Sequence, residues 1–240
     1  MLLAPTSQHP TPLLSSVLDQ IGAEIINGTI TTGQTFTLLD ICARFDISRT
    51  VARETMRALE QMGLVASSRR VGITVLPMTE WAVYDQAIIN WRLQSERTRA
   101  DQLGSLNQLR LAVEPIAARL AARRATAEEC AELAALARRL TELETSPPSR
   151  VGEELATDLR FHTMILHASG NEMFAALAPS LLSIFKGKSV FGSPKRDPVA
   201  GTTQLHHELA AAIRDRDPDR AEHLSRIILD ENRASSHRDW

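Results

Sequence analysis

The stretch DISRTVARETMRALEQMGLV, residues 46–65, decides the fold of the first part of the chain. Ser48 is a good helix N-cap, and Gly63 is the residue type that most often ends a helix. Between them apolar residues recur at helical spacing, which predicts a helix over 49–62. The polar side of this helix carries arginines at positions 49, 53 and 57. The question is whether this helix is an ordinary amphipathic one or one that reads DNA.

The composition narrows the classes of protein. A net charge of −2 over 240 residues excludes a uniformly basic coat for nucleic acid, yet residues 44–70 hold six arginines against three acids. The two cysteines, Cys42 and Cys130, lack CxxC spacing and are typical of core residues in a reducing compartment. No apolar run approaches a membrane span, and the start of the chain does not resemble a signal peptide. We therefore expect a cytoplasmic protein with a flexible arm over 1–11.

The order of the elements predicts two domains. A helix that stops at Asn27-Gly28, a second helix over 35–45 and the helix over 49–62 precede two short β-type runs, 64–67 and 73–76. Three helices followed by a hairpin make a winged helix-turn-helix, here over 12–78. No strand is predicted after this point, and helices are expected at 80–94, 100–123, 126–144, 152–169, 171–187, 203–216 and 218–235. The expected fold is mainly α, with an all-helical domain over 79–240.

The helix over 49–62 and the hairpin turn carry the candidate DNA contacts. A recognition helix buries an apolar face and presents a polar one to the major groove, and arginine pairs bidentately with guanine edges and with phosphates. A glycine in the turn allows backbone to approach DNA closely. The alternative is a solvated arginine face, which stays open for Arg57 taken alone. The candidate DNA-binding residues are Ser48, Arg49, Thr50, Arg53, Arg57, Arg70 and Gly72.

A family resemblance supports this interpretation. Residues 12–77 resemble the DNA-binding domain of the GntR family of transcriptional regulators, which implies double-stranded operator DNA as a partner. The chain departs from the family at 36–40, where Phe-Thr-Leu-Leu-Asp replaces the usual Leu-Pro-Ser-Glu type of helix start. The matching residues are Ile21, Ile25, Asn27, Gly28, Thr32, Gly33, Ser48, Arg49, Arg53, Glu54, Leu59, Gly63, Leu64, Val65 and Gly72.

In the helical domain, Asp158 and His162 lie four residues apart and therefore on one face of the predicted helix over 152–169. A carboxylate and an imidazole at this spacing can hold one divalent metal ion. An exposed Asp–His pair without a metal explains the same spacing. The residues alone leave both interpretations open.

Residues 80–236 resemble the FCD domain, the ligand-binding domain of the FadR subfamily of GntR regulators. The matching runs are 109–117, 158–162, 169–171 and 206–217. The resemblance implies that Asp158, His162 and His206 bind a divalent metal of the Zn, Ni or Mn class, with Ile228 where a fourth histidine is expected. It also implies that Arg110 holds the carboxylate of an effector. Glu114 and Lys186 complete the candidate effector site, although an ordinary helix salt bridge explains Arg110 with Glu114 equally well.

Trp91, the run RLAVEPIAAR over 110–119 and the missing fourth histidine resemble regulators of the galactonate-operon type, which implies a sugar acid as effector. We therefore expect a homodimeric repressor that binds a palindromic operator and is released by a small carboxylate such as gluconate or galactonate. An alternative is the same class of regulator responding to lactate or another small hydroxy acid. A metal-dependent enzyme that uses Asp158, His162 and His206 fits less well, because no nucleophile or general base stands out and the winged unit would be unexplained. A third interpretation is a structural metal protein that binds no ligand.

Overall fold

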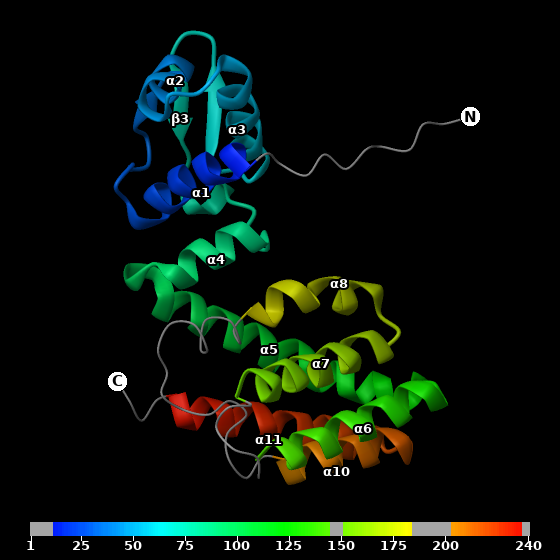
Figure 1. Cartoon of the computed structure of the whole chain (residues 1–240). Coiled ribbons are helices and arrows are strands. Elements are labelled where there is room, and N and C mark those ends of the chain that lie inside the picture. Colours follow the sequence, from blue (N-terminus) through cyan, green and yellow to red (C-terminus); the bar gives the residue numbers. More distant parts are fainter. Residues whose placement is uncertain (1–11, 145–150, 184–202, 237–240) are drawn as a thin grey trace, which may run out of the picture. The chain divides into compact units, whose positions relative to one another are not determined.

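The computed structural model describes residues 12–144, 151–183 and 203–236 (Figure 1). The chain divides into two compact units, one up to Arg99 and one from Ala100. The structure confirms the predicted fold class, a winged helix-turn-helix followed by a helical domain. The elements up to Arg99 are α1 Pro12–Asn27, β1 Thr35–Phe36, α2 Leu38–Phe45, α3 Arg49–Gln61, β2 Val65–Ser68, β3 Gly72–Val75, the 3-10 helix η1 Met78–Glu80 and α4 Gln86–Gln94. The remaining elements are α5 Glu96–Arg124, α6 Ala127–Glu144, α7 Val151–Ala168, α8 Glu172–Leu181, α10 Thr203–Arg214 and α11 Pro218–Ser236.

The sheet of the first unit has the order β1-β3-β2, and both pairings are antiparallel. The helix expected over 35–45 begins at Leu38 instead, because Thr35 and Phe36 pair with β3 as a third strand. Thr37 ends that strand and caps α2: its hydroxyl accepts from Asp40 N at 3.2 Å, while Asp40 Oδ2 accepts from Thr37 N at 2.7 Å. This reciprocal capping box starts α2 in place of the usual family sequence.

The segment after the sheet packs against the end of helix α3. Gly63 has φ +71°, and a Cβ at this position would lie 2.1 Å from the carbonyl oxygen of Glu80. Ala82 N donates to Met62 O at 2.9 Å in the same region. The helix expected over 80–94 therefore begins only at Gln86, where Asp85 is the N-cap. Gly63 thus ends α3 and also leaves room for a neighbouring main chain.

Helix α4 belongs to the core of the winged unit. The Trp91 side chain is buried with the residues of α1, and its Nε1 donates to Asp19 Oδ1 at 3.0 Å. Gly22 lies directly under the ring, since a Cβ there would come within 2.4 Å of it. Arg97, in the first turn of α5, donates to Ile26 O at 2.6 Å. The first compact unit therefore extends through α4, beyond residue 78, where the character of the sequence changes.

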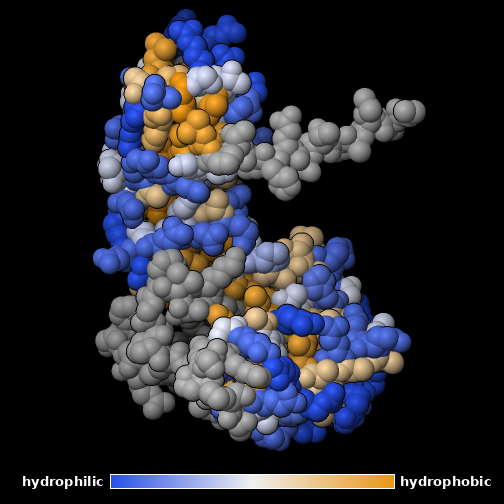
Figure 2. All heavy atoms as spheres, viewed as in Figure 1, coloured by the Kyte–Doolittle hydropathy of each residue, from blue (hydrophilic) through white to orange (hydrophobic). Residues whose placement is uncertain are grey.

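The second unit is a bundle in which α6 packs against α7 and α10, α10 against α11, and α7 against α8 (Figure 1). Four buried alanines of α5 permit close helix packing, because they carry almost no side-chain volume: Ala117, Ala118, Ala121 and Ala122. Hydrophilic residues dominate the face of this unit drawn in Figure 2. Among the described helices, none is long and apolar enough to span a membrane.

Candidate functional site

Helix α3 presents opposite faces to the core and to solvent. Ser48 caps it, with its hydroxyl accepting from Val51 N at 3.3 Å. Ala52, Met56 and Leu59 bury the inner face, at 0%, 5% and 0% exposure. The structure thus confirms the predicted cap and the amphipathic division of this helix.

The arginines of the outer face differ in their partners. Arg49, Thr50 and Arg53 are exposed, and neither arginine makes a hydrogen bond or ion pair with the described residues. Arg57 is exposed too, but its Nη1 donates to Glu54 Oε1 at 2.7 Å. Two guanidinium groups of α3 are therefore free to bind an external anion or base edge, whereas the third is already paired.

The wing is the β2–β3 hairpin, which closes at the pair Ser68 and Gly72. Arg70 is exposed in its turn, as is the apolar Val71 beside it. Gly72 has φ +92°, and a Cβ there would lie 2.8 Å from the carbonyl oxygen of Phe36. The close approach of Gly72 to strand β1 therefore explains why a glycine is needed at this position. The hairpin pattern in the sequence does not indicate this contact.

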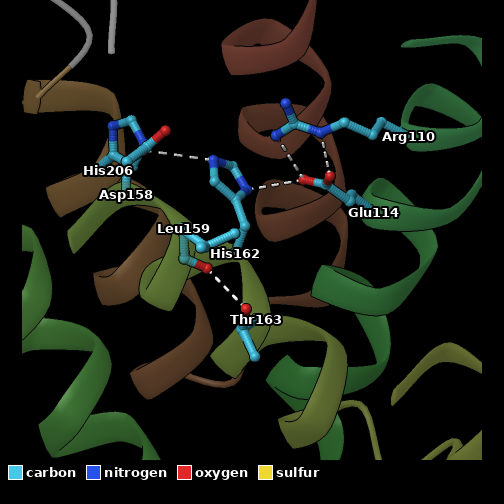
Figure 3. Close-up of polar contacts among 7 residues, drawn as sticks. All are labelled: Arg110, Glu114, Asp158, Leu159, His162, Thr163 and His206. Atoms are coloured by element: carbon cyan, nitrogen blue, oxygen red, sulfur yellow. Dashed lines mark hydrogen bonds and ion pairs between the residues drawn. The ribbon is translucent and has the colours of Figure 1, made fainter. Parts of the chain in front are cut away.

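A second candidate site lies inside the helical unit. Asp158 and His162 project from α7 and His206 from α10, and each of the three residues is only 1% exposed. Asp158 Oδ1 lies 3.1 Å from His206 Nε2 and 3.6 Å from His162 Nε2 (Figure 3). One donor atom from each of the three residues falls within 4.8 Å of the others. The burial excludes the alternative of an exposed Asp–His pair.

These residues fit a divalent metal ion. Two imidazoles and one carboxylate are a donor set typical of Zn²⁺, Ni²⁺ or Mn²⁺ sites. Both carboxylate oxygens of Asp158 are buried and accept no well-directed hydrogen bond from the described residues, so the two nearby imidazoles are the groups that offset the cost of burying this charge, and a metal ion could take over that role. Ile228 stands where the family resemblance implies a fourth histidine ligand, and it is fully buried on α11. A metal bound here would have three protein ligands from the described residues.

The neighbouring histidines do not join the cluster. His207 points away from it, and its Nε2 lies 2.9 Å from the hydroxyl of Thr141. His223 is exposed on α11. The choice of His206 rather than His207, which adjacent helical positions alone cannot settle, therefore agrees with the structure.

Arg110 and Glu114 connect α5 to this cluster. Nε and Nη2 of Arg110 donate to the two carboxylate oxygens of Glu114, the second at 3.3 Å. Glu114 Oε2 also lies 2.8 Å from His162 Nδ1 (Figure 3). The i,i+4 spacing on α5 predicted the first contact. The second joins two helices through space, and no local pattern in the sequence indicates it. Lys186, the remaining candidate effector residue, lies outside the described residues.

The buried charges stabilise one another. Burial opposes the ionisation of Glu114, but Arg110 and His162 outweigh it and lower the pKa of its carboxyl to about 2. Burial likewise opposes the ionisation of Asp158, yet His162 and His206 hold the pKa of this carboxyl well below its ordinary value. Burial disfavours a charged His162, but Glu114 and Asp158 raise its pKa to about 9. An arriving metal ion would thus displace a proton from the imidazolium of His162.

Comparison with known proteins places both units. Residues 105–231, more than half of the chain, match the model of the FCD domain, and residues 13–75 match that of the bacterial regulatory proteins of the gntR family. The galactonate operon transcriptional repressor of Escherichia coli (strain K12) is 28% identical over 213 residues, 87% of this chain and 90% of the relative. The transcriptional repressor NanR of Salmonella newport (strain SL254) is 26% identical over 200 residues, 82% of this chain and 75% of the relative.

Solved structures agree at the level of the fold. A GntR protein of Streptococcus agalactiae superposes with a TM-score of 0.52 at 21% identity, over 92% of this chain and 99% of that one. The similar proteins are transcriptional regulators rather than enzymes. One chain thus combines two features. Its winged unit carries arginines on α3 that are unpaired within the described residues, and its FCD domain contains a buried Asp–His–His cluster. The chain belongs to the GntR family of bacterial transcriptional regulators, in the branch that carries an FCD domain.

Proposed function

We propose that this regulator is a metal-dependent, metabolite-responsive repressor. It binds a palindromic operator as a homodimer and is released by a small carboxylate, with a sugar acid such as galactonate or gluconate as the effector. The observation that carries the proposal is the buried cluster of Asp158, His162 and His206, which Glu114 connects to the buried Arg110. These residues combine a metal-binding donor set with a cation suited to a carboxylate.

On the DNA side, Arg49 and Arg53 enter the major groove on α3, and Thr50 lies on the same exposed face. Ser48 fixes the start of the helix, while Arg70 approaches the phosphates or the minor groove from the wing. Arg57 contributes when its pairing with Glu54 yields to a phosphate. Two winged units related by a two-fold axis would read the two halves of a palindrome.

On the effector side, Arg110 gives Nε and Nη2 to Glu114, and we propose that its remaining N–H groups pair with the carboxylate of the ligand and orient it. A bound divalent ion would supply open coordination positions for the carboxylate and the neighbouring hydroxyl oxygen of the acid. Ile228 contributes an apolar wall where a fourth histidine would stand. The name of the Escherichia coli relative, a galactonate operon repressor, favours a sugar acid. Lactate and other small hydroxy acids share the same pair of donor atoms and remain the alternative effectors.

Calorimetry tests this proposal. Galactonate, gluconate and lactate are titrated into protein loaded with Zn²⁺, Ni²⁺ or Mn²⁺ and into protein stripped with a chelator. We expect one of the acids to bind the loaded protein, to bind the stripped protein more weakly, and to weaken operator binding, since coupling between two ligands is reciprocal. Equal affinity in both samples, or unchanged affinity in His162→Ala, would show that the metal does not hold the effector.

A further inference from the structure

Glu114 is held by partners from two helices. Arg110, one turn earlier on α5, donates to both of its oxygens, and Oε2 also lies 2.8 Å from His162 Nδ1 on α7 (Figure 3). The three residues are each 1% exposed. An ionised carboxylate only accepts hydrogen bonds, so Glu114 would repel the carboxylate of an acid rather than bind it. Both of its oxygens already have partners within the protein, which favours a role in holding those partners over a direct contact with the effector.

The two nitrogens of His162 face different partners. Nδ1 faces Glu114, whereas Nε2 faces Asp158 Oδ1 at 3.6 Å. An imidazole that binds a metal uses the lone pair of one nitrogen, while the other nitrogen donates its hydrogen, often to a carboxylate that fixes the ring. Because Glu114 can only accept, it favours a hydrogen on Nδ1. When a metal ion displaces the other proton, Nε2 is left with the lone pair, and this nitrogen lies near Asp158 Oδ1, as His206 Nε2 does.

We propose that Glu114 is a positioning residue for the metal site. It holds His162 with Nδ1 protonated and Nε2 directed at Asp158 and His206, and Arg110 holds Glu114 in turn. This inference rests on the proposed metal at the cluster and deepens it, because it assigns a role to a side chain that touches neither metal nor effector. The chain from Arg110 through Glu114 to His162 also joins α5 directly to a metal ligand on α7.

The wild-type protein offers the first test. Protein containing ¹⁵N-labelled histidine is loaded with Zn²⁺, and two-bond nitrogen–proton NMR spectra report the state of each ring nitrogen, with His162→Ala used to assign the His162 signals. The expected spectrum has a protonated Nδ1 and a metal-bound Nε2 at His162. A metal-bound Nδ1 would overturn the proposal, and this measurement does not depend on the folding of a Glu114 variant.

The second test is Glu114→Gln, which keeps the size and one acceptor oxygen but loses the charge. Titration with Co²⁺ should show a metal affinity about 10–100-fold lower than wild type, with shifted visible absorption bands of the bound ion. At saturating Co²⁺ the effector affinity should be retained. The matched control is Glu132→Gln, an exposed glutamate on α6 that pairs with Arg160 and should leave Co²⁺ affinity unchanged.

The outcomes separate this inference from the proposed function. Wild-type Co²⁺ affinity in Glu114→Gln, together with a loss of effector binding, would return Glu114 to the effector site and overturn the positioning role alone. Failure of the wild-type protein to bind any of the tested divalent ions would remove the metal from the proposed function, and the positioning role with it.

Discussion

At the scale of the residue, the arginines of α3 differ in whether a side chain of the protein already holds them. Arg57 is paired with Glu54, whereas Arg49 and Arg53 have no such partner among the described residues. A free guanidinium has no internal contact to give up when it binds a base edge. Equal exposure therefore does not imply an equal contribution to DNA binding.

We predict that Arg53→Ala and Arg49→Ala each cost about 1–3 kcal/mol of specific operator binding, the range of a good bidentate base contact. Arg57→Ala should cost less, because its pairing with Glu54 must first be broken. Binding titrations at one fixed salt concentration measure this, with Arg123→Ala, an exposed arginine of α5, as the control. Wild-type affinity in both Arg49→Ala and Arg53→Ala would remove the recognition role of α3.

Two glycines allow the cost of backbone strain to be measured apart from the cost of a steric clash. Gly63 and Gly33 both have positive φ, at +71° and +83°. A Cβ on Gly33 meets nothing within 4 Å, whereas one on Gly63 would lie 2.1 Å from Glu80 O. We predict that Gly33→Ala costs about 1 kcal/mol and Gly63→Ala clearly more, because only the second must displace a main chain. Denaturant unfolding of the two variants measures the difference, and equal losses would contradict the tight contact.

At the scale of the element, the start of α2 depends on two side chains. Thr37 and Asp40 satisfy one another's main-chain N–H groups, which have no partner inside the helix. Thr37→Ala should lower the free energy of unfolding by about 1 kcal/mol, the usual cost of removing an N-cap. Thermal unfolding measures this loss, and an unchanged midpoint would mean that the strand pairing of β1 alone positions α2.

The same cap predicts a dependence on pH. Hydrogen bonds from the main chain and hydroxyl of Thr37 lower the pKa of Asp40 below its ordinary value of 3.8. Since the folded pKa is the lower one, the stabilisation is present above 3.8 and is lost as the pH falls through the folded value. Asp40→Asn should therefore unfold at a lower temperature than wild type at pH 7, and the difference should shrink as the pH falls below 3.8. A difference that stays constant down to pH 3 would contradict an ionised cap.

An element can be predicted from the sequence when nearby residues determine it, and it is missed when a distant segment does. Ser48, Gly63 and the spacing between them specify α3 within a few residues, and the structure begins and ends it almost where expected. Strand β1 is only two residues long and depends on pairing with β3, so the sequence around Thr35 does not reveal it. The contact of Glu114 with His162 is equally non-local. The spacing of Asp158, His162 and His206 in the sequence does not indicate that α7 and α10 lie together. The family resemblance implied it, and the three residues were predicted as one site for that reason.

At the scale of the whole molecule, the unit that binds DNA is longer than its helix-turn-helix and wing. Helix α4 shares the core of α1 through Trp91 and Ile88. We propose that the dimer contacts, in contrast, lie in the helical domain that follows, over 79–240. Stability and operator affinity should therefore depend on different lengths of chain.

We predict that a fragment of residues 1–99 unfolds cooperatively, whereas a fragment of residues 1–79 is less stable because it exposes the surface that α4 covers. Both should bind the operator more weakly than the full chain. Circular dichroism melts and operator titrations distinguish these effects, and Trp91→Ala in the longer fragment is the control that should reproduce the loss. A 1–79 fragment as stable as 1–99 would show that α4 adds nothing to the unit.

The contact between Gly22 and Trp91 has a consequence for the evolution of the family. Because a methyl group at position 22 would come within 2.4 Å of the indole ring, neither site can change in isolation without loss of the contact. A descendant that acquires a side chain at position 22 must first, or at once, accept a smaller residue at position 91. The two positions should therefore vary together among related regulators. Glycine at position 22 should accompany tryptophan at position 91, and a larger residue at position 22 should accompany a smaller one at position 91.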